Sequence, residues 1–243
     1  MRMLTFARRN TLEILRDPLT IAFGLGFPLV LILLLSAIQA NIPVSLFEIE
    51  HLTPGVTVFG MAFMTLFSAT VISRDRKTSL LSRLYTTPLT AIDFILGYTL
   101  PIIPLTILQG VICYLAAFTL GLKPTVNVIY AILFLIPVSL LYIGLGLLCG
   151  SIFNDKQVGG ICGALLTNVS AWLSGIWFDL ELVGGTFRKI AYLFPFVHAV
   201  NLERAVLAGD FSDIAVPLLW VMAYAVIILI GAVIAFLGQM KKQ

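Results

Sequence analysis

The sequence predicts an all-α integral membrane protein with six transmembrane helices, an N-terminal amphipathic helix at the membrane interface, and an outer re-entrant helical pair between spans five and six. Only 11% of the 243 residues are charged and the mean hydropathy is +1.05, whereas a soluble domain carries about 25% charged residues. Six stretches of at least 22 residues contain no charge, and each is long enough for a helix that crosses the hydrocarbon core. Since lipid offers open backbone groups no hydrogen-bond partner, we expect these spans to be helices.

Residues 1–17 are expected to form an amphipathic helix on the inner membrane surface. The apolar side is predicted to hold Met3, Leu4, Ala7, Thr11, Ile14 and Leu15, and the polar side Arg2, Arg9, Glu13 and Arg16. The alternative is a basic flank that only orients the first span. Pro18 ends the helix and begins the six-helix domain, residues 18–240.

The six uncharged stretches are residues 18–47, 52–73, 94–122, 124–154, 157–178 and 214–240. With the N-terminus inside, the inner segments hold 11 Lys and Arg residues and the outer segments hold 4. Positive residues favour the cytoplasmic side, so we expect a multi-pass protein of a bacterial cytoplasmic (inner) membrane with both termini cytoplasmic. The net charge of +3 is explained by this bias and does not indicate nucleic-acid binding.

The second and fifth spans contain small and polar residues that are candidates for a substrate path. They are Thr57, Met64 and Ser68 in the second span, and Thr167, Asn168 and Ser170 in the fifth. Such residues would suit a bulky amphipathic substrate. Ordinary helix packing through small residues explains them equally well.

The outer segment, residues 179–213, is only partly polar. Residues 187–194 (FRKIAYLF) and 196–207 (FVHAVNLERAVL) are expected to form two short helices separated by Pro195, with Gly209 as the stop. Neither is long enough to span, which predicts a segment that dips back into the outer leaflet. The candidate residues of an outer gate are Arg188, Pro195, His198 and Arg204. His198 is not expected to bind a metal, because no second His or Cys lies near it in the sequence.

Several kinds of chemistry are excluded. The sequence has no Gly-Lys dipeptide and therefore no P-loop, and it lacks the H-E-x-x-H and G-x-S-x-G motifs. We expect no catalytic residue and no metal site. The absence of charges within the six stretches argues against the proton relays of an ion-coupled carrier. If the protein moves a substrate uphill, the energy must come from another subunit.

Residues 75–90 between spans two and three are expected to form a short cytoplasmic coupling helix. Leucines fall on one side of it, basic residues fall elsewhere, and Thr-Thr-Pro ends it. The candidate docking residues are Leu80, Leu81, Arg83, Leu84, Thr87 and Pro88. A basic loop that enforces topology would explain the positive charges but not the leucines.

Four places in the chain match a known family pattern. They are Arg16-Asp17-Pro18 followed by Phe27-Pro28; the stretch 74–97 with Leu80, Arg83, Leu84, Thr87, Pro88 and Gly97; Ser174-Gly175; and Pro195, His198 and Arg204. In their order and spacing, the chain resembles the membrane subunit of type-2 ABC exporters over essentially its whole length.

The resemblance implies two copies of the permease, identical or paralogous, with two ATP-binding subunits docked below them. The substrate would be a drug, antibiotic, lipid or glycan, and ATP and Mg²⁺ would bind the partner subunit, so no cofactor is expected in this chain. Two other functions fit parts of the sequence: a membrane scaffold or assembly factor without transport, and an ion-coupled secondary carrier.

Overall fold

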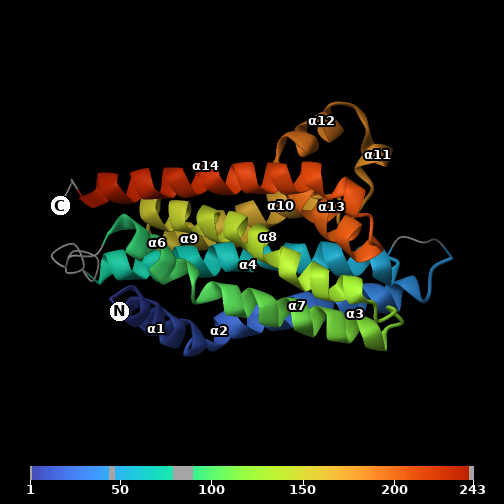
Figure 1. The fold of residues 1–243 in the computed structure, drawn as a ribbon, viewed down its shortest axis with the longest axis horizontal. Coiled ribbons are helices and arrows are strands. Elements are labelled where there is room, and N and C mark those ends of the chain that lie inside the picture. Colours follow the sequence, from blue (N-terminus) through green and yellow to red (C-terminus); the bar gives the residue numbers. More distant parts are fainter. Residues whose placement is uncertain (1, 44–46, 79–89, 241–243) are drawn as a thin grey trace.

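The computed structural model describes residues 2–43, 47–78 and 90–240, and these residues form an elongated helical bundle (Figure 1). The first half of the chain contains α1 (Arg2–Leu15), α2 (Pro18–Ile21), the π-helix η1 (Ala22–Gly26), α3 (Phe27–Gln39), α4 (Ile49–Lys77), α6 (Ala91–Thr99) and α7 (Ile102–Thr119). The second half contains α8 (Val126–Ile152), α9 (Asp155–Val158), the π-helix η2 (Gly159–Leu166), α10 (Thr167–Leu173), α11 (Leu180–Val183), α12 (Gly185–Leu193), α13 (Pro195–Ala208), the 3₁₀ helix η3 (Phe211–Asp213) and α14 (Ala215–Met240).

Both chain ends lie at the same end of the bundle, which we call the basal end (Figure 1). The opposite, distal end carries α11 and α12. Five helical stretches of the described residues are long and apolar enough to cross a membrane: Ala22–Gln39, Ile49–Lys77, Ile92–Thr119, Val126–Ile152 and Phe211–Gln239. They correspond to the expected spans one, two, three, four and six.

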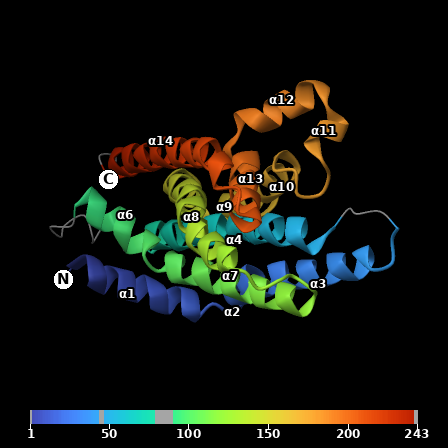
Figure 2. The same ribbon diagram turned by 45° about the vertical axis from the view of Figure 1, so that its right-hand side comes forward.

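The expected fifth span is helical from Asp155 to Leu173 through three consecutive elements. It falls outside the set of five because its first turn is polar and Asn168 interrupts its apolar sequence. It leads from the end of α8 toward α13 (Figures 1 and 2). Because the chain starts and finishes at the same end of the bundle, it passes along the bundle an even number of times. The five apolar stretches give five passes, and residues 155–173 give the remaining one.

The helical pair expected after the fifth span is confirmed. Helices α12 and α13 meet at Pro195 with an 80° bend. Pro195 occupies the first turn of α13, where its missing N–H has no intrahelical partner to lose. Gly209 ends α13 with a φ of 83°, a left-handed conformation that glycine adopts without steric cost.

Helix α4 forms the centre of the bundle, because 89% of its membrane-length window is buried, against 17% for α14 and 22% for the first span. It packs closely on α8. A Cβ atom on Gly150 would lie 2.7 Å from the Ala69 carbonyl oxygen, so only glycine permits this approach. The Thr65 hydroxyl donates to the Tyr142 carbonyl at 2.7 Å, which adds an interhelical hydrogen bond of the kind that joins membrane helices.

Candidate functional site

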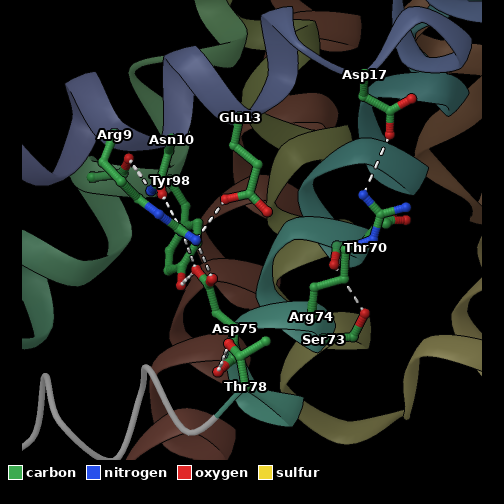
Figure 3. Close-up of polar contacts among 11 residues, drawn as sticks. Arg9, Asn10, Glu13, Asp17, Thr70, Ser73, Arg74, Asp75, Thr78 and Tyr98 are labelled. Atoms are coloured by element: carbon green, nitrogen blue, oxygen red, sulfur yellow. Dashed lines mark hydrogen bonds and ion pairs between the residues drawn. The ribbon is translucent and has the colours of Figure 1, made fainter.

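A group of polar side chains joins three helices at the basal end (Figure 3). We call it the basal cluster, and it consists of Arg9, Asn10 and Glu13 from α1, Asp75 from α4 and Tyr98 from α6. These positions are separated by up to 89 residues in sequence. Their convergence ties the N-terminal helix to the ends of two spans.

Asp75 is the centre of the basal cluster and is only 1% exposed. Two Arg9 nitrogens donate to its two carboxylate oxygens, each at 2.6 Å. The Tyr98 hydroxyl donates to the same carboxylate at 2.7 Å. A bidentate arginine supplies two charge-assisted hydrogen bonds in a fixed geometry, so the buried charge is matched and its position is defined.

Asn10 and Phe6 fasten α1 to α6 beside this ion pair. The buried Asn10 amide donates to the Gly97 carbonyl at 2.9 Å. The Phe6 ring packs edge-on against Tyr98 with 4.9 Å between ring centroids. A Cβ atom on Gly97 would overlap the Phe6 ring, which explains why glycine is needed at this contact.

Electrostatics in the basal cluster favour a charged Arg9. Burial alone would lower the pKa of Arg9, but the hydrogen bond and the charge of Asp75 outweigh it, and the pKa of Arg9 is raised. Burial raises the pKa of Glu13, and the Asp75 charge raises it further against the opposing effects of Arg9 and Arg74. Glu13 lies 2.6 Å from Arg9, so it shares the arginine that Asp75 holds.

The basal cluster lies next to the point where the predicted coupling segment leaves α4. Residues 75–77 of that prediction belong to α4, which continues to Lys77. Arg76 supports this last turn by donating to the carbonyls of Gly150 and Phe153 at 2.9 and 3.2 Å. At the other attachment, Thr90 and Asp93 form a reciprocal cap that begins α6.

The six candidate docking residues themselves, Leu80, Leu81, Arg83, Leu84, Thr87 and Pro88, lie outside the described residues. The two candidates at the junction of α1 and α2 are described. Asp17 accepts a hydrogen bond from the Leu19 amide at 3.2 Å and pairs with Arg74 at 3.3 Å, while Arg16 is exposed.

Five of the six candidates for a substrate path are packed inside the single subunit: Thr57, Met64, Ser68, Thr167 and Ser170. The Ser68 hydroxyl contacts the Ile143 carbonyl at 3.3 Å, so it contributes to the packing of α4 on α8. Asn168 differs, because it is exposed and its amide donates to the Ala164 carbonyl at 2.8 Å within its own helix.

The candidates for an outer gate lie at the distal end. Arg204 donates to the Gly175 carbonyl at 3.2 Å and to the His51 carbonyl at 3.4 Å. It thereby connects α13 to the turn after α10 and to the first turn of α4. His198 contacts the Tyr192 carbonyl at 2.9 Å, just before the break at Pro195.

Two further features complete this region. Arg188 pairs with Glu181 at 2.6 Å on the surface. A cavity of about 480 Å³ opens beside Arg204, with an aromatic and polar lining that includes Phe47, Trp177 and Asn201.

Sequence reasoning missed two buried carboxylates. Asp75 falls in the stretch expected to form a cytoplasmic loop helix, and Glu203 falls in the helix expected over residues 196–207, without either being singled out. Glu203 is 0% exposed, and neither of its oxygens has a hydrogen-bond partner among the described residues. A helical periodicity test would have placed it on the buried stripe of α13, three and four residues from Val200 and Ala199.

No group of three or more His, Cys, Asp or Glu residues that could hold a metal occurs in the described part of the chain. Residues 1–208 match a family model described as ABC-2 type transporter. A search of curated proteins finds no match to this chain.

Proposed function

The chain belongs to the ABC-2 type transporter family, and from this premise we propose that it is the permease of an exporter driven by separate ATP-binding subunits. It is a multi-pass membrane subunit of that family, and its sequence contains no P-loop with which it could itself bind and hydrolyse ATP. The proposed cargo is a drug, antibiotic, lipid or glycan. The proposed location is a bacterial inner membrane.

The observation that carries the proposal is the basal cluster. It binds α1, the last turn of α4 and the last turn of α6 into one unit, next to the point where residues 79–89 leave α4. A force applied to that segment by an ATP-binding subunit would reach the central helix α4 directly. Packed helices move between discrete arrangements and do not deform continuously, so such a force would move α4 from one arrangement to another.

We test the docking role with Leu84→Asp. A leucine that anchors an interface contributes about 2 kcal/mol or more, so this variant should fold and insert but lose both the ATP-binding subunit and export. Leu182→Asp is the matched control, because Leu182 is 83% exposed at the distal end. Pull-down of the ATP-binding subunit by Leu84→Asp at the wild-type yield, with export unchanged, would reject the docking role.

Arg83→Ala should weaken both binding and export in part, because an exposed ion pair contributes at most about 1 kcal/mol. The difference from wild type should be largest at low salt and should shrink as salt rises, because salt screens the ion pair that only the wild type makes. Purification of the chain with its native neighbours also separates the alternatives. A scaffold or an ion-coupled carrier would not bring down an ATPase of domain size.

The proposed second copy, identical or paralogous, would contact the exposed face of α9, η2 and α10. A Cβ on Gly160 would meet nothing within 4 Å, and the exposed Asn168 is a polar group that is costly to leave in lipid. Asn168→Cys should form an oxidative cross-link between copies. Ile227→Cys on α14, a residue 65% exposed, is the control that should not.

The proposed outer gate depends on Arg204. Arg204→Ala would release the carbonyls of His51 and Gly175, and export should fall while binding of the ATP-binding subunit stays intact. Lys189→Ala is the control, because Lys189 is an exposed cation of α12 outside the set of gate candidates. Equal export by the two variants would reduce the segment to an ordinary loop.

The proposed orientation has both termini in the cytoplasm. A cysteine replacing Asp210 at the distal end should react with an impermeant reagent in intact cells. A cysteine replacing Asn154, which is exposed at the opposite end of α8, should not. The reverse pattern would overturn the orientation.

A further inference from the structure

A groove at the basal end lies where α1 turns into α2 and faces α4. Its volume is about 560 Å³. We call it the interfacial groove, and it is lined by Arg9, Leu12, Glu13, Arg16, Asp17, Pro18 and Arg74.

The charges of the interfacial groove are balanced. Asp75, beneath the groove, matches the charge of Arg9 through two hydrogen bonds. Two arginines, Arg16 and Arg74, then stand against two carboxylates, Glu13 and Asp17. Equal numbers of cations and anions on one surface fit a zwitterion better than a simple anion.

Two arginines of the interfacial groove have side chains that can donate hydrogen bonds to a ligand. The Arg16 side chain is exposed and makes no ion pair within the described residues. Arg74 contacts Asp17 through one nitrogen at 3.3 Å and its side chain is 48% exposed. An arginine has five N–H donors, so both can bind a phosphate group.

The groove lies at the depth of lipid headgroups. The first apolar span begins at Ala22, four residues after Pro18 and thus about 6 Å along a helix. Arg74 opens the charged last turn of α4. Exposed leucines point outward here, as in an amphipathic helix at a membrane surface: Leu12 lines the groove, and Leu15 and Leu19 lie beside it.

We propose that the interfacial groove binds the headgroup of a phospholipid with a primary ammonium, as in phosphatidylethanolamine. Arg16 and Arg74 bind the phosphate, and Glu13 and Asp17 accept hydrogen bonds from the ammonium. A choline headgroup has no N–H to donate. An anionic glycerol headgroup would bring its phosphate to the arginines but would add no cation for the two carboxylates.

The test measures lipid retention by the full chain. The protein is exchanged into nanodiscs that contain equal amounts of phosphatidylethanolamine, phosphatidylcholine and phosphatidylglycerol, and co-purifying lipid is counted by native mass spectrometry after detergent release. Wild type should retain phosphatidylethanolamine over each of the others by about tenfold, since a charge-assisted hydrogen bond contributes on this scale. Arg16→Gln and Asp17→Asn should each remove most of this preference.

Arg8→Gln is the matched control, because Arg8 is an exposed arginine of the same helix outside the groove. It should retain the wild-type preference. Equal retention of phosphatidylglycerol, or an unchanged preference in Arg16→Gln, would overturn the proposal. Displacement of the lipid by soluble glycerophosphoethanolamine at a matched concentration would also overturn it, because the ligand would then be a free phosphodiester and not a membrane lipid.

Discussion

Two buried carboxylates at opposite ends of the bundle have opposite surroundings. Asp75 at the basal end is 1% exposed and receives three hydrogen bonds from Arg9 and Tyr98. Glu203 in α13 is 0% exposed and receives none from the described residues. The same functional group therefore has two different environments in one chain.

The difference shows which contacts hold the bundle together. A buried charge is stable only when it is paired and hydrogen-bonded, so Asp75 depends on α1 and α6 being in place. Glu203 has no hydrogen-bond partner among the described residues, and an isolated carboxyl group in apolar surroundings is buried at lower cost when it is neutral. The basal cluster makes α1 part of the fold, whereas Glu203 is tolerated within the packing of α13.

The largest effect is expected for Arg9→Gln. This change removes the only cation that hydrogen-bonds to Asp75 among the described residues and leaves its charge buried, which costs about 3 kcal/mol of unfolding free energy, the lower end of the range for broken buried pairs. Denaturant titration in detergent micelles measures it. Arg8→Gln is the control on the same helix, and an equal loss in both variants would show that Arg9 acts through general surface charge.

Asp75→Asn is expected to cost less, about 1–2 kcal/mol. The amide keeps an acceptor for Tyr98, and Arg9, which is 39% exposed, can turn to water or remain with Glu13. The double variant with Arg9→Gln should be less destabilised than the sum of the two single changes. An additive result would mean that the two side chains do not interact.

Tyr98→Phe should cost about 1 kcal/mol, the contribution of one hydrogen bond, because both Arg9 contacts to Asp75 remain. The same denaturant titration measures this loss. Tyr130→Phe is the control, since the Tyr130 side chain is 42% exposed. A loss near that of Arg9→Gln would move the centre of the basal cluster from the ion pair to the tyrosine.

The helices of this bundle could be predicted from the sequence, because they follow from composition over long stretches or from single Pro and Gly residues. Uncharged stretches give the apolar helices, and Pro195 with Gly209 gives the bent pair, since each acts through its own backbone. The basal cluster could not be predicted in the same way. Asp75 lies between Arg74 and Arg76 and reads as part of a charged loop until the fold brings Arg9 and Tyr98 to it from distant positions.

The smallest effect is expected for Glu203→Gln, which makes the same acid-to-amide change as Asp75→Asn. If Glu203 is neutral, the amide replaces one uncharged polar group by another of equal size, and the unfolding free energy should change by about 0.5 kcal/mol or less. Glu203→Met should stabilise the fold, because it removes a buried polar group without a partner among the described residues. Both are measured by the same denaturant titration as the basal variants. A loss above about 2 kcal/mol in Glu203→Gln would mean that Glu203 is ionised and bound to a group beyond the described residues, such as a second copy. Both buried carboxylates would then be ionised and paired, and the contrast between the two ends of the bundle would not hold.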